Sequence, residues 1–409
     1  MKSRNKAAES LLVVGNLVRI AVLGSLCLLP LVAPAADFTP LGDLPGGEFS
    51  SRAGAVSDEG SVVVGESRSA DGREAFRWTT SGGMVGLGDL PGTIFLSSAT
   101  DVSADGFIVV GAAGGEFGIQ AFRWTDTDSM TVLGEPTVAG AATSASQMSP
   151  DGAVVVGFMS LGGGQQAFRW KPTDGITELP YLGEGGIRSS ANSVSADGTV
   201  IVGFSENPSE QQAVRWTSSD VVGLGFLPGG TNRSGATATS ADGSIIFGYA
   251  EVNSGYQAFR WTAAGGMEPL GDVPEVDHQI LILETSADGA IAGGGNLTGP
   301  STEKAIIWTR DGGIQPLAEV LAANGATIPA GWTLKVANGV SANGRWVVGV
   351  GRNRDGFDEA FLADIRPSGS SGGGSIDHLS LLILSAVVLW RARRQRSRPF
   401  PAGTGGRMT

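Results

Sequence analysis

The stretch from Asp101 to Gly134, DVSADGFIVVGAAGGEFGIQAFRWTDTDSMTVLG, decides the fold. Short apolar runs alternate in it with Gly, Asp and Ser clusters, a pattern typical of short strands joined by tight turns. The pattern predicts one antiparallel unit of four strands. The expected strands are Ala99–Ser103, Phe107–Gly111, Gln120–Thr125 and Met130–Gly134.

The same unit recurs through the chain in one register. Its turn glycine recurs at steps of 46, 46, 46, 45, 46 and 55 residues, and a third-strand tryptophan and a fourth-strand leucine follow the same period. The glycines are Gly60, Gly106, Gly152, Gly198, Gly243, Gly289 and Gly344. The tryptophans are Trp78, Trp124, Trp170, Trp216, Trp261 and Trp308. Such a period indicates a solenoid, a propeller or an array.

The two ends of the repeat complement each other. Phe38 to Gly42 has the pattern of a lone fourth strand, whereas the last repeat ends with its third strand, Glu359–Ile365. A closed ring would use this complementarity, because the N-terminal strand can complete the last sheet and hide both edges. The sequence therefore predicts an all-β, seven-bladed β-propeller of four-stranded antiparallel blades over residues 36–367.

The third strand carries the block A-F-R-W in most repeats. Alternation along a strand places its Phe and Trp on one face, where we expect them in the core between blades. The arginine between them needs a partner among packed sheets, and the turn aspartate is one candidate. The alternative is that Asp-Gly serves turn geometry alone. The arginines are Arg77, Arg123, Arg169, Arg215 and Arg260, and the aspartates are Asp105, Asp151, Asp197 and Asp242.

Residues 1–35 have the pattern of a secretory signal peptide. Basic residues precede an apolar run over Ile20–Val32, and Ala33-Pro34-Ala35 offers a cleavage site after Ala35. Cys27, the only cysteine, lies within this segment. We therefore expect the exported protein to lack disulfides and zinc-thiolate sites.

The C-terminal end has the pattern of a second targeting signal. Residues 368–375 are a Gly- and Ser-rich linker, and residues 376–398 combine a short apolar helix with an arginine cluster, which would face the cytoplasm. Residues 399–409 form a tail that would also be cytoplasmic. Because the apolar part is short for a bilayer, we expect a transient anchor.

Charge narrows the choice of partners. The chain carries a formal charge of −12, and residues outside the two terminal segments hold 18 of the 28 basic and 38 of the 40 acidic residues. A surface this acidic argues against nucleic acid and anionic membranes as partners. The membrane would be contacted only through the C-terminal helix before processing.

Two resemblances bear on location. The V-S-A-D-G, V-V-G and A-F-R-W blocks over residues 38–365 resemble HAF-type bacterial extracellular repeat proteins, although Glu or Gln replaces the family's histidine in most repeats. The tail with Gly373, Gly374 and Ser375 resembles the GlyGly-CTERM sorting signal of Gram-negative bacteria. The signal-peptide pattern itself predicts cleavage by signal peptidase. The resemblances imply cleavage of the tail by a rhomboid-type sorting protease and a cell-surface or extracellular location. They imply no activity.

The sequence offers little catalytic chemistry. No G-x-S-x-G and no paired-histidine metal motif occurs. We therefore predict no catalytic residue, no metal and no cofactor, and expect a binding propeller for an extracellular or envelope protein or glycan. The alternative is a hydrolase or lyase of polysaccharide that uses two carboxylates, which would face each other in a deep pocket.

The binding surface, if present, should be made by the loops that follow fourth strands and those between second and third strands. These loops differ between repeats, whereas the strands are constant, and specificity can reside where packing does not constrain the sequence. The alternative is neutral drift in solvated loops. The candidate ligand residues are Arg52, Phe95, Arg188, Arg233, Tyr256 and His278.

Overall fold

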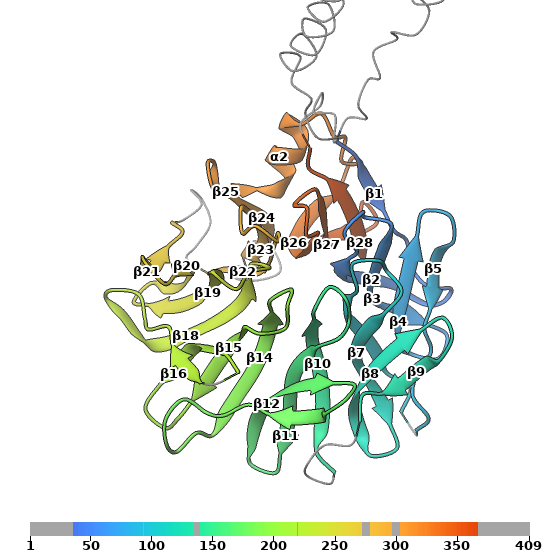
Figure 1. The fold of residues 1–409 in the computed structure, drawn as a ribbon. Helices are drawn as coiled ribbons and strands as arrows, with labels where there is room; N and C mark the ends of the chain where they lie inside the picture. Colours follow the sequence, from blue (N-terminus) through green and yellow to red (C-terminus); the bar gives the residue numbers. More distant parts are fainter. Residues whose placement is uncertain are drawn as a thin grey trace, which may run out of the picture. The chain divides into compact units, whose positions relative to one another are not determined.

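The computed structural model of the chain describes residues 36–92, 94–134, 140–218, 220–271, 279–296 and 303–366. These residues form strands, turns and one short helix, α2 (Leu317–Ala323). Figure 1 shows the sheets following one another around a common centre. The expected signal peptide, His278 and the expected linker, helix and tail from residue 368 onward lie outside the described residues.

The strands are short and regular in order. They are β1 (Phe38–Pro40); β2 (Gly46–Val56), β3 (Val62–Ser69), β4 (Arg73–Thr79), β5 (Gly83–Gly86); β6 (Ser97–Val102), β7 (Val109–Gly115), β8 (Gly118–Thr125), β9 (Ser129–Val132); β10 (Ala142–Met148), β11 (Val155–Leu161), β12 (Gly164–Lys171), β13 (Gly175–Glu178); β14 (Arg188–Val194), β15 (Ile201–Glu206), β16 (Gln211–Trp216), β17 (Val221–Gly223); β18 (Gly230–Thr239), β19 (Ile245–Val252), β20 (Gly255–Thr262), β21 (Gly266–Pro269); β22 (Ile280–Thr285), β23 (Ile291–Asn296), β24 (Lys304–Thr309), β25 (Gly313–Pro316); β26 (Thr333–Val340), β27 (Trp346–Arg352) and β28 (Asp358–Asp364).

Each repeat forms an antiparallel unit in which neighbours in sequence are neighbours in space. The units β2–β5, β6–β9 and β22–β25 are separate four-stranded sheets. The units β10–β13, β14–β17 and β18–β21 are linked into one larger sheet, in which single parallel contacts join Gln165 to Arg188 and Gln211 to Arg233.

The N-terminal strand β1 lies beside β28, in one sheet with β27 and β26. Phe38 is opposite Ala363 and Pro40 is opposite Phe361. The first strand of the described residues therefore supplies the fourth strand of the last unit, as the phase of the repeat predicts.

The quoted stretch forms its four predicted strands with small shifts. β7 begins at Val109 rather than at Phe107, because the preceding turn is longer than expected. The backbone N–H of Ser103 donates to the Ile108 carbonyl at 2.9 Å, and the Ile108 N–H donates to Ser103 Oγ at 2.9 Å. These two bonds keep Ile108 inside the turn.

The turn glycine is required for two reasons. Gly106 has φ +79°, a left-handed conformation that costs other residues about 1–2 kcal/mol. A Cβ at Gly106 would also lie 2.5 Å from Cγ2 of Val62 in the preceding unit. The same contact recurs between all successive units: the pairs are Val62–Gly106, Ile108–Gly152, Val154–Gly198, Val200–Gly243, Ile245–Gly289, Ile291–Gly344 and Trp346–Gly60.

Each innermost strand carries a one-residue β-bulge. In β6 the bulge is Thr100, between the pairs Ala99–Gly111 and Asp101–Val110. Gly111 must be glycine, because a Cβ there would clash with the backbone carbonyl of Ser98. The bulge residue also ties units together, since Thr100 Oγ1 donates to the Ala145 carbonyl of the next unit at 3.1 Å.

The repeated aromatic residues pack between units, as predicted. Phe76, Phe122, Phe168, Phe259 and Phe361 are fully buried. The tryptophans divide into two groups. Trp78, Trp216 and Trp308 are buried, whereas Trp124, Trp170 and Trp261 are half-buried against the edge of the core.

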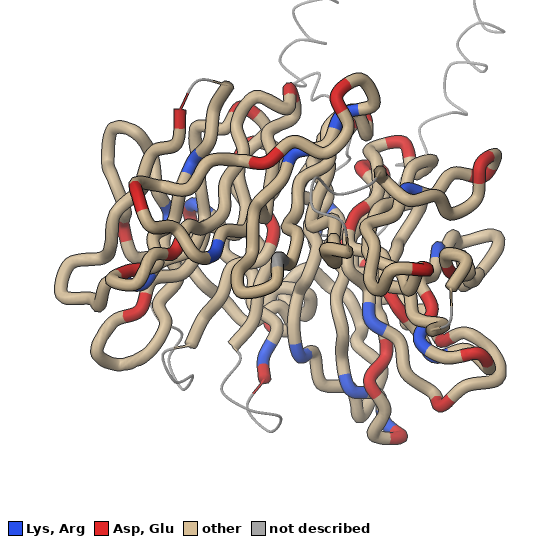
Figure 2. Tube along the Cα trace, turned by 90° about the horizontal axis from the view of Figure 1, so that it is seen from below, with Lys and Arg blue, Asp and Glu red and all other residues tan. Residues whose placement is uncertain are grey.

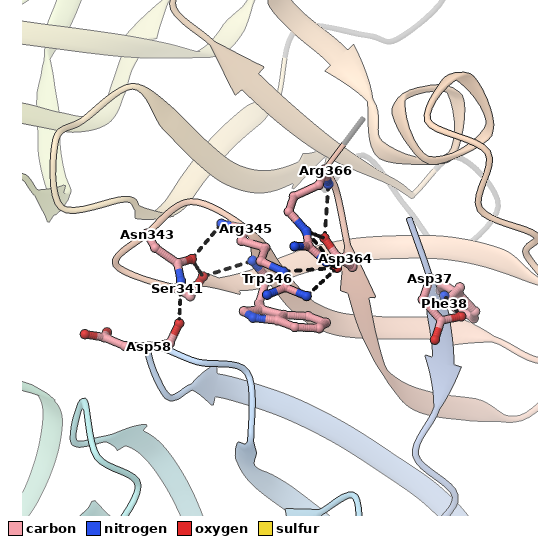
Figure 3. A network of polar contacts seen from close by, with 9 residues as sticks. All are labelled: Asp37, Phe38, Asp58, Ser341, Asn343, Arg345, Trp346, Asp364 and Arg366. Carbon is pink, nitrogen blue, oxygen red and sulfur yellow. Dashed lines mark hydrogen bonds and ion pairs between the residues drawn. The ribbon is translucent and has the colours of Figure 1, made fainter. Parts of the chain in front are cut away.

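A polar network joins the last unit to the first, as Figure 3 shows. Asp364 accepts hydrogen bonds from Arg345 at 2.9 and 3.0 Å and from Arg366 at 2.8 Å. Burial raises the pKa of Asp364, but the hydrogen bonds from Arg366 and Arg345 outweigh it and hold the pKa below its ordinary value. Asn343 Nδ2 donates to the backbone carbonyl of Asp58, in the first unit, at 2.8 Å.

Candidate functional site

The turns between first and second strands lie on one side of the sheets, which we call the turn face. Neighbouring turns are hydrogen-bonded, for example from the Ala104 N–H to the Pro150 carbonyl at 2.9 Å. Within one turn, Asp105 accepts from Ser103 Oγ at 2.6 Å and from the Phe107 N–H at 3.1 Å. These two bonds, chiefly that from Ser103, lower the pKa of Asp105. The turn aspartates therefore serve turn geometry.

The repeated arginines do not pair with these aspartates. Arg77 donates through Nε and Nη2 to the backbone carbonyl of Gly106, at 3.2 Å in both cases. Within the described residues, the buried Nε atoms of Arg169, Arg215 and Arg260 have no hydrogen-bond partner. Of the two interpretations left open by the sequence, the structure supports turn chemistry rather than the ion pair.

The opposite side, which we call the loop face, is where the sequence placed the candidate ligand residues, of which Arg52, Phe95, Arg188, Arg233 and Tyr256 are described. Figure 2 marks the charged residues on the Cα trace, where positions of both signs are interspersed. The structure brings three of the candidates together. Arg188, Arg233 and Tyr256 come from two neighbouring units and surround Tyr249.

The two arginines occupy the same position in successive repeats. Arg188 begins β14 opposite Gln165, and Arg233 lies in β18 opposite Gln211. Both side chains are exposed. Arg188 Nη1 lies 3.4 Å from Glu206 Oε2, but that oxygen accepts no hydrogen bond within the described residues. Apart from this one ion pair at Nη1, the guanidinium donors of Arg188 are open to a ligand.

Tyr249 is held in place from three sides. Gln211 Nε2 donates to Tyr249 Oη at 3.0 Å, and the Tyr256 ring meets the Tyr249 ring edge-on with centroids 5.5 Å apart. Gly235 leaves room for the ring, because a Cβ there would lie 2.8 Å from Tyr249 Cζ. Burial raises the pKa of Tyr249, although the Gln211 bond and the charges of Arg233 and Arg188 lower it in part. Tyr249 therefore stays a neutral phenol that can donate its own O–H.

The chain has three tyrosines, and the third lies on the same side of the molecule. Tyr181 Oη donates to the backbone carbonyl of Gln165 at 3.0 Å, and Gln165 is the strand partner of Arg188. We call Tyr181, Arg188, Arg233, Tyr249 and Tyr256 the tyrosine–arginine arc. It extends over the units β10–β13, β14–β17 and β18–β21.

The remaining candidates lie apart from the arc. Arg52, in β2, forms an ion pair with Asp358 at 3.0 Å, and Lys335 contacts the same carboxylate at 3.1 Å. Phe95 packs over the backbone of Gly72 in another unit. His278 lies outside the described residues. The predicted face thus brings together three of the candidates, in the arc, whereas the Arg52 charge is already compensated.

A cavity of about 110 Å³ lies at the centre, lined by first strands of all the units. Its lining includes the polar side chains of Asp101, Gln147 and Glu284, each of which follows a bulge. Gln147 Nε2 donates to Glu284 Oε2 at 2.7 Å, and the Val194 N–H donates to Gln147 Oε1 at 2.9 Å. Gln147 thus links three units across the cavity.

The carboxyl groups of Asp101 and Glu284 in the cavity have raised pKa values. Burial raises the pKa of Asp101 to about 7. Burial, with a smaller part from the charge of Asp101, raises the pKa of Glu284 to about 8. Their oxygens are nevertheless occupied: Asp101 accepts from the Val102 and Met148 N–H groups at 2.8 Å, and Glu284 accepts from the Thr285 N–H at 2.9 Å and from Gln147. They bind strands to one another.

Sequence reasoning missed Tyr249 and the cavity residues, although signals for both are present. Tyr249 occupies the second-strand position at which other repeats have Phe158 and Phe204, a position whose pattern predicts core. The matching Gly235 is the signal, since every other repeat has a residue with a side chain there, namely Arg52, Ser98, Ser144, Ser190, Leu281 or Val336. Asp101, Gln147 and Glu284 share one repeat position, which small residues occupy in the other units.

Within the described residues, no group of three or more His, Cys, Asp or Glu side chains could hold a metal ion. The described part of the chain also has no helix long and apolar enough to span a bilayer. The expected C-terminal helix lies outside these residues.

Comparison with known proteins bears on the fold. No protein-family model and no curated protein matches the sequence. An oligogalacturonate lyase from Vibrio parahaemolyticus has a TM-score of 0.52 and 11% identity, over 82% of this chain and 99% of that one. The β-propeller domain of Cps50 (Swd1) from Myceliophteria thermophila has a TM-score of 0.48 and 11% identity, over 80% of this chain and 98% of that one.

The successive antiparallel sheets, arranged around a common centre, make the fold a β-propeller. TolB from Acinetobacter baumannii is a further match, with a TM-score of 0.43 and 14% identity over 73% of this chain and 67% of that one. At these identities the similarity is one of fold, and the propeller's function has to be argued from its own residues.

Proposed function

We propose that this propeller is an exported, non-catalytic binding protein whose seven blades form a ring closed by β1. The pairing of β1 with β28, the Asn343 bond to Asp58 and the contact of Trp346 with Gly60 support closure. A closed ring leaves no unpaired sheet edge between its first and last blades.

The tyrosine–arginine arc carries the proposal of binding. Arg77 is covered at the turn face, and Arg52 shares the Asp358 carboxylate with Lys335, whereas Arg188 has a single ion pair, 3.4 Å from Glu206. Arg188 and Arg233 are exposed beside rings that packing holds in place. Exposed cations and preorganised aromatic side chains are the groups that dominate recognition surfaces. The ligand would be an extracellular or envelope protein or a glycan.

The location is proposed from the two ends of the sequence. Signal peptidase would remove residues 1–35 after Ala35, and a rhomboid-type protease would act near Gly373, Gly374 and Ser375. The helix within residues 376–398 would hold the protein in the inner membrane until that cleavage. The product would be displayed at the cell surface or released.

A binding screen of the full-length protein tests the proposal. Purified cell-envelope fractions, extracellular proteins and a glycan array are probed, and the glycans are also assayed for cleavage. We expect binding without turnover, and loss of binding when Arg188 and Arg233 are both replaced by alanine. Unchanged affinity in that variant, with loss on replacing Asp105 and Asp197 at the turn face, would place the site on the other side.

The alternative is a polysaccharide hydrolase or lyase that uses Asp101 and Glu284. Their raised pKa values and their shared cavity favour it. Against it, both carboxyls already accept hydrogen bonds from the protein, and the cavity volume of about 110 Å³ leaves little room for a sugar chain. Glycan cleavage that disappears in Asp101→Asn would establish the enzyme and refute the binding role.

A further inference from the structure

We propose that the tyrosine–arginine arc binds an acidic polysaccharide, with the uronate carboxylates on Arg188 and Arg233 and the sugar rings against the tyrosines. This inference rests on the proposed binding function and names its ligand class. It follows from the charge, the rings and the spacing of the arc.

The charge of the arc favours a carboxylate ligand. Guanidinium groups bind carboxylates through paired hydrogen bonds, and these are stronger than neutral ones. The Arg188–Glu206 ion pair is 3.4 Å long without a hydrogen bond to Glu206 Oε2, and Arg233 is exposed. Because the chain as a whole is at −12, an anion would be repelled elsewhere and would find this local pair of cations favourable.

The rings favour a sugar rather than a bare anion. A tyrosine offers an apolar face for packing and a hydroxyl for hydrogen bonding. Tyr256 and Tyr249 are fixed edge to face, and Tyr249 takes the Gln211 amide as donor, which leaves its own O–H to donate to a ligand hydroxyl. All three tyrosines of the chain belong to the arc, so this chemistry is concentrated on one side of the ring.

The spacing of the arc favours a polymer. Arg188 and Arg233 occupy the same position of successive repeats, and a tyrosine accompanies each of them: Tyr181 through Gln165, and Tyr249 through Gln211. The two cations recur at one repeat position, and each has a tyrosine bonded to its glutamine partner, although the tyrosines come from different positions of the repeat. Two such cations with rings match a chain in which each sugar carries one carboxylate. A single monosaccharide would leave half of the arc empty.

Another cluster of cations on the loop face lacks this combination. Lys335 is 2.8 Å from Glu303 and 3.1 Å from Asp358, and Asp358 also holds Arg52. These charges compensate one another without an anion. Binding should therefore be confined to the arc rather than spread around the ring.

The test uses the full-length protein with alginate, a polyuronate, and with its propylene glycol ester, in which the same chain has lost most of its charge. Affinity is measured by isothermal titration at several salt concentrations. We expect the wild type to bind alginate, to bind the ester far more weakly and to lose affinity as salt is added. The double variant Arg188→Ala/Arg233→Ala should weaken alginate binding by about 10-fold or more.

Matched controls separate the arc from general electrostatics. Arg73→Ala/Arg352→Ala removes the same charge from two exposed, ion-paired arginines of other units, and it should leave affinity unchanged. Tyr256→Phe should retain most of the affinity and Tyr256→Ala should lose it, because the ring face is what the sugar contacts. Denaturant melting of each variant checks that the fold is intact.

The outcomes distinguish this inference from the binding function itself. The protein could fail to bind alginate yet bind a neutral glycan or a purified envelope protein, with that binding abolished by Arg188→Ala/Arg233→Ala. This result would overturn the ligand class and keep the binding function. Equal loss in both double variants would overturn the arc as the site. Cleavage of bound alginate would keep the ligand class and overturn the non-catalytic role.

Discussion

The contact between successive turns makes a sharp prediction at Gly106. Gly106→Ala places a Cβ at φ +79°, where strain costs about 1–2 kcal/mol, and 2.5 Å from Val62 Cγ2, where overpacking costs about 1–3 kcal/mol. The sum is a loss of about 2–5 kcal/mol in the free energy of unfolding. Guanidinium denaturation followed by tryptophan fluorescence measures it.

Gly83 supplies the matched control. It has φ +67°, and no other atom lies within 4 Å of the point that a Cβ would occupy, so Gly83→Ala should cost only the backbone strain of about 1–2 kcal/mol. Adding Val62→Ala to Gly106→Ala removes the methyl group that clashes, and the double-mutant cycle should show favourable coupling of at least about 1 kcal/mol. Equal losses for the two glycine variants, or no coupling with Val62, would refute packing between successive turns.

Three further predictions concern stability. Phe122→Ala should cost about 3–5 kcal/mol in denaturant melting, and Trp124→Ala less, because Phe122 is fully buried and Trp124 half-buried; equal costs would contradict this. Asp364→Ala should lower the free energy of unfolding by about 3 kcal/mol at neutral pH. Since the lowered pKa of Asp364 makes its contribution vanish only in acid, the variant and wild type should converge below pH 3.8, and a constant difference would refute the linkage. Between about pH 5 and pH 8 the wild type should lose stability as pH rises, because folded Glu284, with a pKa of about 8, and folded Asp101, with a pKa of about 7, keep protons that the unfolded chain releases. Glu284→Gln should reduce this slope, most clearly between about pH 7 and pH 8, and an unchanged slope would contradict the raised pKa of Glu284.

The repeat made most of the architecture predictable. The turn glycine, the third-strand tryptophan and the fourth-strand leucine recur in one register and define the repeat units. The lone strand at Phe38 indicates its pairing with β28. The strand limits were less predictable. Phe107 and Ile108 have the composition of a strand, yet Ser103 holds Ile108 within the turn through side-chain and backbone bonds.

The site was only partly predictable, because its residues become neighbours through packing between units. Variation among loops indicated Arg188, Arg233 and Tyr256. Tyr249 lies within a strand, at a position where an aromatic side chain is normally predicted to be in the core. Gly235, across from it, leaves room for the Tyr249 ring, whose hydroxyl accepts a hydrogen bond from Gln211. The sequence could not decide whether the turn aspartates pair with the repeated arginines or only shape the turns, because the spacing fits both interpretations.

The central claim is that the loop face binds the ligand, and hydrogen–deuterium exchange on the full-length protein tests it most directly. The protein is compared with and without the strongest ligand from the binding screen. The account predicts protection confined to the loop-face segments 181–188, 206–211, 230–235 and 252–256, with the turn-face segments 103–108 and 195–200 unchanged. Protection of the turn-face segments, with the loop-face segments unchanged, would contradict it.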